Sequence, residues 1–262
     1  VYVAGFFRFL FGFLIILPYI FKSKFTVFKT THHKKHFFRA FLNLPSMLLY
    51  FSALVMLPIE KVTAISFVVP FFVTILAVLF LGEKIYIYRT LALVLGFIGM
   101  IVILRPGIIN ISIGVYMALA SSLMWSVVII ITKSIAKDDS SITILSYGYV
   151  IMTILSFVIV LFNWQTPGLQ TLIYLFFAGL SGTLLHLCIN HAYKLVDVSM
   201  TQPYSFLSLI FASLIGYFVF SETPDLFTWI GASIIFIGVF IMSYREMKLD
   251  KEIIRKRIDI KS

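Results

Sequence analysis

Residues 92–104, ALVLGFIGMIVIL, and residues 231–243, GASIIFIGVFIMS, occupy equivalent places in two halves of the chain that are related by a shift of 139 positions. Under that shift Glu83 falls on Glu222, and the shared Phe-Ile-Gly follows each Glu at the same distance. Only eight of the 55 residue pairs over residues 50–104 are identical, so the agreement of spacing carries more weight than the identity. The chain is therefore predicted to contain one structural unit twice.

The composition predicts an integral membrane protein. The chain is 61% hydrophobic and 12% charged, whereas soluble proteins average about 25% charged residues. A membrane-spanning helix needs about 20 mostly apolar residues, and stretches of that kind recur along the sequence with short loops between them. We predict an all-α fold with nine spans: Val3–Phe21, Ala40–Leu57, Thr63–Leu81, Thr90–Leu104, Ser112–Thr132, Ile142–Phe162, Leu172–Tyr193, Met200–Phe220 and Phe227–Tyr244.

The positive charges predict the orientation of these spans. Lys and Arg stay on the cytoplasmic side of a membrane protein. If the first span runs from outside to inside, 18 of the 21 Lys and Arg residues lie in cytoplasmic segments; the exceptions are Lys61, Arg105 and the intramembrane Arg8. The formal charge of +10 is thus a topology signal, and its spread over five segments argues against binding of nucleic acid. We expect the protein to lie in the inner membrane of the cell, with its C-terminus in the cytoplasm.

The repeat also predicts how the halves are arranged. The span Ser112–Thr132 opens the second half, and its counterpart 139 residues earlier would precede Val1. We therefore expect an intact fold of five plus five helices whose first helix is missing from this chain, the alternative being a genuine nine-span protein. Because five is odd, the halves form an inverted repeat. The expected domains are residues 1–107, residues 108–244 and a basic cytoplasmic tail, residues 245–262.

Polar residues inside the spans are candidate substrate contacts, because polar groups in a membrane usually face the bundle interior. His186 and Asn190 are four residues apart and share one helix face. Trp125 lies near the middle of its span, away from the interfaces where membrane Trp is commonest. The alternative role for these polar groups is hydrogen bonding between helices. His186 is also the one evident candidate for a proton carrier.

Two repeat-related spans each contain an early proline, Pro70 and Pro203. A proline frees a backbone carbonyl in a helix, and interrupted spans in two halves of a transporter indicate the binding site. The two prolines do not align under the shift, so the repeat does not relate them. Each proline still indicates a binding site through the interruption of its own span. Together with the previous residues, these spans predict a substrate site formed by Tyr50, Ser66, Trp125, His186, Asn190, Pro203 and Tyr204.

Other chemistry is not indicated by the sequence. It contains no phosphate-binding GxxxxGK[ST] loop, no HExxH and no Cys/His ligand spacing, so no metal, cofactor or enzymatic activity is predicted. His32, His33 and His36 fall in a basic segment that is read as a topology anchor. Arg8 is expected to be the only charge well inside a span, and Glu83 and Glu222 are expected to cap or pair at span ends.

Several short motifs resemble the EamA branch of the drug/metabolite transporter superfamily, and their order holds over nearly the whole chain. They are Gly5-Phe-Phe-Arg-Phe-Leu10, Leu81-Gly82-Glu83, Gly96 to Gly99, Pro203-Tyr204 and Glu222-Thr-Pro-Asp225. The resemblance implies ten-helix inverted repeats with both ends in the cytoplasm. Within that branch the chain is similar to the S-adenosylmethionine uptake transporters of obligate intracellular bacteria, which would put Pro203 and Tyr204 near the substrate.

The function expected from all of these features is movement of a small metabolite by alternating access, with uptake of S-adenosylmethionine as the candidate reaction. The alternatives left open are an exporter of amino acids or drugs of the same superfamily and a nonfunctional truncated membrane protein. The partners expected are the small-molecule substrate and the lipid bilayer; the sequence does not give an oligomeric state.

Overall fold

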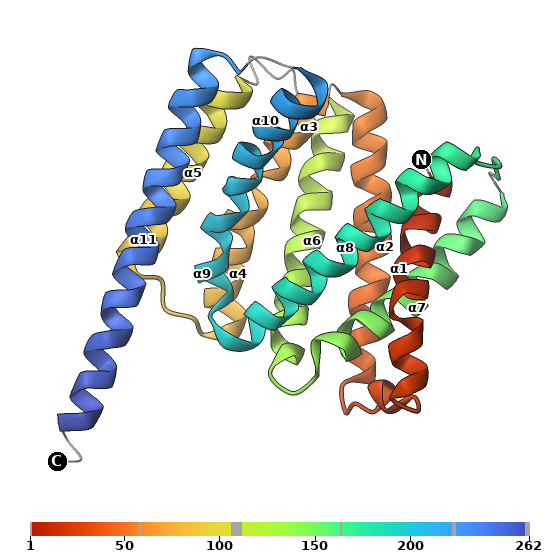
Figure 1. The fold of residues 1–262 in the computed structure, drawn as a ribbon, viewed down its shortest axis with the longest axis horizontal. Coiled ribbons are helices and arrows are strands. Elements are labelled where there is room, and N and C mark those ends of the chain that lie inside the picture. Colours follow the sequence, from red (N-terminus) through yellow and green to blue (C-terminus); the bar gives the residue numbers. More distant parts are fainter. Residues whose placement is uncertain (1, 58, 106–111, 163, 222–223, 260–262) are drawn as a thin grey trace.

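The chain forms a helical bundle in the computed structural model, which describes residues 2–57, 59–105, 112–162, 164–221 and 224–259 (Figure 1). Within these ranges nine segments are long and apolar enough to span a membrane, as predicted. Seven of them are continuous helices: α1 (Tyr2–Lys22), α2 (His33–Met56), α5 (Ile87–Leu104), α6 (Ile113–Ala136), α7 (Ser141–Leu161), α8 (Leu169–Leu195) and α11 (Leu226–Asp259). A short 3₁₀ turn, η1 (Thr26–Phe28), connects α1 to α2.

Two spans are interrupted, one in each half. In the first half α3 (Ile59–Ser66) ends before α4 (Val69–Leu81) begins. In the second half α9 (Val198–Thr201) passes through the 3₁₀ segment η2 (Gln202–Phe206) into α10 (Leu207–Phe220). Pro70 stands in the first turn of α4 and Pro203 in the first turn of η2, where a missing N–H costs no helical hydrogen bond. The prolines therefore begin the second part of each interrupted span.

The helix boundaries repeat under the 139-residue shift. Both ends of α1 map onto the ends of α7. The C-terminal ends of α2 and α4 map onto those of α8 and α10, respectively. The first residues of α3 and α5 map onto those of α9 and α11, respectively. Five crossings separate α1 from α7, so the two run in opposite directions and the repeat is inverted. The shift places the counterpart of α6 before residue 1, so α6 has none within the sequence.

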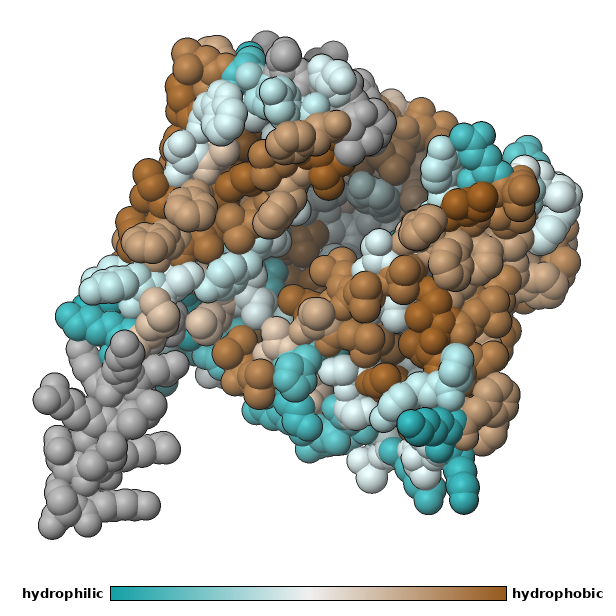
Figure 2. All heavy atoms as spheres, in the orientation of Figure 1, coloured by the Kyte–Doolittle hydropathy of each residue, from teal (hydrophilic) through white to brown (hydrophobic). Residues whose placement is uncertain are grey.

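The outer surface of the bundle is apolar over its middle zone (Figure 2). Leu79, Phe80 and Phe218 are each at least 70% exposed. Exposed apolar patches of this extent are rare on soluble proteins and are typical of surfaces that contact lipid. The chain is thus embedded in a membrane through several spans.

The two ends of the bundle differ in charge. The end at which α1, α4, α6 and α8 finish carries Lys22, Lys84, Lys133 and Lys194, and the extended α11 leaves the bundle there, at the lower edge of Figure 1. We call this the basic end. The opposite or distal end carries Arg105 and the connections between α7 and α8 and between α10 and α11.

The two halves are packed into one another. α6 of the second half packs on α2 and α4 of the first, α1 packs on α7 and α8, and α5 packs along α11. The last pair is very close: a Cβ at Gly99 would lie 2.7 Å from the Gly231 carbonyl oxygen, and a Cβ at Gly231 would lie 2.6 Å from that of Gly99. Only glycine at both places lets these backbones touch, and the space between the halves is enclosed by helices from each.

Candidate functional site

A cavity of about 550 Å³ lies between the two halves. Its walls come from α1, α2 and α4 of the first half and from α6, α7, α8, α9, η2 and α10 of the second. Figure 2 shows the surface hollowed between the α10 and α8 segments. The volume is in the range of small-molecule binding sites, about 300–1,000 Å³. The polar residues in the wall are Arg39, Asn43, Trp125, Thr132, Tyr149, His186, Asn190, Tyr193, Thr201, Gln202, Tyr204, Ser205 and Ser208.

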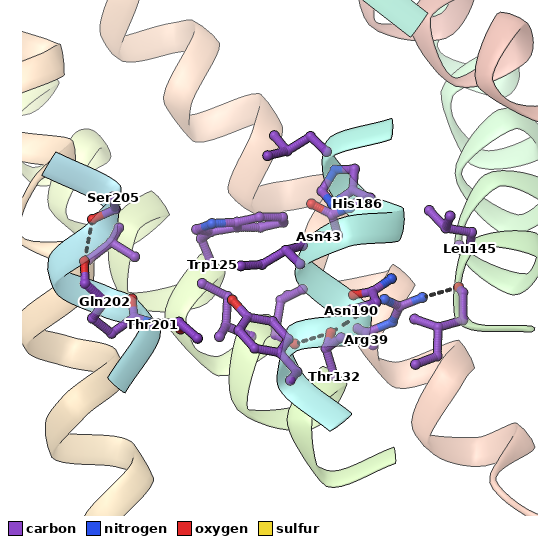
Figure 3. A pocket seen from close by; sticks show the side chains of 18 of the residues that line it. Arg39, Asn43, Trp125, Thr132, Leu145, His186, Asn190, Thr201, Gln202 and Ser205 are labelled. Carbon is purple, nitrogen blue, oxygen red and sulfur yellow. Dashed lines mark hydrogen bonds between the residues drawn. The ribbon is translucent and has the colours of Figure 1, made fainter. Parts of the chain in front are cut away.

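Four of the seven predicted site residues line this cavity: Trp125, His186, Asn190 and Tyr204. The indole of Trp125 on α6 and the imidazole of His186 on α8 meet edge to face, with ring centroids 6.4 Å apart. Both point toward the cavity in Figure 3, and Asn190 follows one turn after His186 along α8. Trp125 therefore offers a ring face, and His186 and Asn190 offer hydrogen-bonding groups, to one enclosed space.

The other three predicted residues are not among those lining the cavity. Tyr50 packs with an apolar cluster of α2, α3 and α6 that includes Ala53 and Val62. The Ser66 hydroxyl donates to the Val62 carbonyl oxygen at 2.8 Å, so its hydrogen bond is made within α3. Pro203 is buried in η2, where it fixes the turn that places Gln202 and Tyr204 on the wall.

The cavity also contains a cation, Arg39, that lies one residue before the predicted span Ala40–Leu57. The predicted span began at Ala40, but α2 begins at His33, because the residues before Ala40 contain no helix breaker and continue the helix. Arg39 consequently lies inside α2 and lines the cavity. The expectation that Arg8 is the only charge well inside a span is wrong for this reason. Arg8 itself is exposed and is not among the lining residues. The spacing of Arg39 and Asn43, four residues apart on one face, was the signal available in the sequence.

Arg39 is held by neutral acceptors from the second half (Figure 3). One terminal nitrogen donates to the Ile144 carbonyl oxygen at 2.7 Å, and the other donates to the Thr132 hydroxyl at 3.3 Å. The Nε atom is buried and has no hydrogen-bond partner in the described part of the chain. Guanidinium groups carry five donors, so this cation retains hydrogen-bonding capacity toward the cavity.

At the basic end the halves are joined by a set of polar contacts that we call the latch, made of Glu83 and Arg89 of the first half and Asp197 and the first residues of α9 of the second. The Glu83 carboxylate accepts from the backbone N–H of Val198 at 2.8 Å and from that of Ser199 at 2.9 Å. It thus caps α9 from the other half, as carboxylates at helix N-termini do. The expectation that Glu83 caps or pairs at a span end agrees with this geometry; Glu222 lies outside the described residues.

Two cations hold the connection between α8 and α9, Arg89 from the first half and Lys133 from within the second. Arg89 on α5 forms an ion pair with Asp197 at 3.0 Å and donates to the Ser199 hydroxyl at 3.1 Å. The Lys133 ammonium on α6 donates to the carbonyl oxygens of Tyr193, at 2.6 Å, and Val196 at the end of α8. Both cations are buried, at 4% and 6% exposure. The connection between α8 and α9 is therefore fixed from several sides.

The distal end has one described ion pair between the halves, Arg105 with Asp225. Their side chains are 49% and 47% exposed. Hydrogen bonds from Arg105 and then from Thr228 hold the pKa of Asp225 well below its ordinary value, at about 2. The carboxylate is consequently ionised at any physiological pH.

A multi-span inverted repeat that encloses a cavity between its halves is the architecture of a membrane transporter. The sequence comparison agrees: the model of the EamA-like transporter family matches residues 1–105 and 112–244, and the chain belongs to that family. Its substrate is therefore a small molecule.

Relatives of this chain are named for different substrates. The S-adenosylmethionine uptake transporter of Rickettsia felis is 32% identical over 94% of this chain and 83% of that protein. The riboflavin transporter of Vibrio cholerae is 29% identical over 90% of this chain and 80% of that protein. Among solved structures, one crystal structure superposes with a TM-score of 0.82 at 16% identity, covering 95% of this chain and 88% of the other, which shows the same fold.

Proposed function

We propose that this protein moves a small metabolite across the inner bacterial membrane by alternating access and that the metabolite is S-adenosylmethionine, taken up into the cell. One observation carries the mechanism. A single cavity is lined by residues of both halves, and the halves are latched to each other at the basic end through Glu83 and Arg89. If the two halves separated at the latch and approached each other at the distal end, the same lining residues would be exposed to the other side of the membrane.

The direction of access follows from the proposed orientation. Lys and Arg concentrate at the basic end, and positive residues stay in the cytoplasm, so the basic end and the C-terminus are taken as cytoplasmic. The latched state is then the one that is closed toward the cytoplasm, and a substrate reaches it from outside. A tag after Ser262 that antibodies reach from outside the cell would overturn this orientation.

The chemistry of the wall supports the proposed substrate. Trp125 and Tyr204 present aromatic faces, on which an adenine ring can stack and toward which a sulfonium cation is attracted by about 2 kcal/mol when desolvated. The Rickettsia relatives with S-adenosylmethionine in their names are 30–32% identical. Riboflavin is a second candidate, because relatives named for it match with 25–29% identity and an isoalloxazine ring also suits an aromatic wall.

Uptake of labelled S-adenosylmethionine by bacterial cells that produce the chain tests the proposal. We expect saturable uptake that unlabelled S-adenosylmethionine blocks and that free amino acids and nucleosides do not. Labelled riboflavin is measured in parallel. Uptake of riboflavin alone would replace the substrate, and efflux from preloaded cells without uptake would support the exporter alternative.

The Trp125→Ala variant connects the uptake to the cavity. Removing a stacking face costs about 1–1.5 kcal/mol, so we expect the apparent KM to rise about tenfold at unchanged protein level in the membrane. Trp229→Ala is the matched control, because Trp229 is 61% exposed on α11 and does not line the cavity. Equal kinetics for the two variants would remove Trp125 from the substrate site.

A further inference from the structure

The cavity has an uneven charge. Among the described residues that line it, Arg39 is the one Lys or Arg, and none is Asp or Glu. Charged groups in a low-dielectric space normally find an opposite charge. The cavity therefore carries one formal positive charge that no lining residue balances.

Arg39 differs from two other arginines that contact the opposite half. Arg89 is paired with Asp197, and Arg105 is paired with Asp225. No ion pair of Arg39 is found in the described part of the chain; its hydrogen bonds go to the neutral oxygens of Thr132 and Ile144. Its buried Nε has no partner there, so the planar fork of donors that suits a carboxylate is only partly used.

The surroundings leave room for the guanidinium group. A Cβ at Gly148 on α7 would lie 3.0 Å from an Arg39 terminal nitrogen, which is closer than a side chain accommodates without movement. Asn190 and Asn43 line the same cavity as Arg39, and Asn43 stands one turn further along α2. Their amide oxygens are neutral acceptors for an ammonium group. Trp125 lies on the other side of the same space in Figure 3.

We propose that Arg39 is the binding point for the carboxylate of the substrate and that the site selects ligands that carry an α-amino-acid group. This inference rests on the proposed function and makes it more specific. S-adenosylmethionine carries an amino-acid carboxylate, whereas riboflavin carries none, so Arg39 separates the two classes of candidate. The carboxylate supplies the charge that the cavity wall does not, while the adenine ring reaches the aromatic side of the cavity.

The sharpest probe is decarboxylated S-adenosylmethionine, which keeps the adenosine, the sulfonium and the amine and lacks only the carboxylate. Its inhibition constant against uptake of labelled S-adenosylmethionine is compared with that of the unlabelled parent. A hydrogen bond to a charged group is worth about 1.5–3 kcal/mol, so we expect the wild type to bind the parent about 10- to 100-fold more tightly. In Arg39→Gln we expect the affinity for S-adenosylmethionine to fall by a similar factor, so that the two ligands bind with equal affinity.

Three further variants separate charge recognition from structural damage. Arg39→Lys keeps the charge without the fork and is expected to retain part of the discrimination. Gly148→Ala displaces the guanidinium while leaving every charge in place, and it is expected to reduce discrimination as well. Lys35→Gln is the control: Lys35 is one turn earlier on α2, is exposed and does not line the cavity, so discrimination should match the wild type. Loss of discrimination in Lys35→Gln, or full discrimination in Arg39→Gln, overturns the inference.

Uptake by the wild-type protein distinguishes failure of the proposed function from failure of the carboxylate site. If it does not take up S-adenosylmethionine, ligand-induced shifts of the melting temperature of the purified full chain are measured with acid and amine pairs: tryptophan with tryptamine, and methionine with 3-methylthiopropylamine. Preference for the acids that disappears in Arg39→Gln would support the carboxylate site for another substrate. Equal shifts for both members of every pair, including no shift with either, would overturn it.

Discussion

The two ends of the bundle join the same two halves with different chemistry. At the basic end Glu83 caps α9, and Arg89 and Lys133 are buried against the connection between α8 and α9. At the distal end the described ion pair, Arg105 with Asp225, is about half exposed. Exposed ion pairs contribute little because water screens them, whereas charge-assisted hydrogen bonds to buried groups are strong. The difference indicates that the basic end is the one firmly closed in this state.

The inverted repeat relates the chemistry of the two ends to the transport cycle. In an inverted repeat the two ends exchange environments when the halves rock past each other. Access from the basic end then requires that the latch contacts break and that contacts of comparable strength form at the other end. A change in the latch should therefore shift the balance between the two states, whereas a change in the exposed distal pair should not.

The largest effect is expected for Glu83→Ala. It removes two charge-assisted bonds to the first N–H groups of α9, worth together about 3 kcal/mol, or roughly a hundredfold in the balance between states. The measurement is the labelling rate of a single cysteine, introduced by Thr201→Cys on the cavity wall in a Cys188→Ala background. With a membrane-impermeant maleimide applied from the side of the basic end, which is the cytoplasm in the proposed orientation, we expect labelling to accelerate at least tenfold.

Two companions define what that result means. Glu83→Gln keeps one acceptor oxygen and should lie between the wild type and Glu83→Ala. Lys84→Ala changes the charge of the neighbouring exposed residue and should label like the wild type. If Lys84→Ala accelerates labelling as much as Glu83→Ala does, the effect comes from the charge of the loop and the cap has no special role.

A smaller effect is expected for Asp197→Asn. Its ion pair with Arg89 joins one buried and one half-exposed side chain, and an asparagine oxygen still accepts a hydrogen bond. A loss of about 1 kcal/mol corresponds to roughly fivefold faster labelling of the same cysteine. Labelling faster than in Glu83→Ala would reverse the order of importance within the latch and make the ion pair its main element.

Much of the fold followed from the sequence because the spans are long, apolar and repeated. Hydrophobic length gave the nine spans, and the 139-residue shift gave the inverted repeat, which the helix boundaries reproduce. The start of α2 was placed seven residues late, at Ala40 instead of His33. Hydropathy marks the part of a helix that lies in lipid, while the helix itself continues through charged residues until a breaker or an unpaired end stops it.

The candidate site was harder to predict, because side-chain direction depends on packing. Trp125, His186 and Asn190 could be found as polar or aromatic residues in mid-span. Ser66 has the same signal, yet its hydroxyl bonds to its own helix, which composition alone does not distinguish from a substrate contact. Arg39 was hidden in a run of basic residues, where the signal for topology and the signal for a binding residue are identical.

The smallest effect is expected for Asp225→Asn at the distal end. Arg105 and Thr228 lower the pKa of Asp225 to about 2, so its interaction stabilises the folded state above the ordinary value of 3.8 and is lost only as the pH falls through about 2. Because the pair is exposed, we expect uptake within about a factor of two of the wild type and unchanged labelling of the cavity cysteine. The melting temperatures of the two proteins should keep a constant difference from pH 8 to pH 4.5. A difference that disappeared between pH 6 and 4.5 would mean that another group titrates with the distal pair. Faster labelling from the side of the basic end would mean that the two ends are coupled through this contact, and the distal end would then share in holding the closed state.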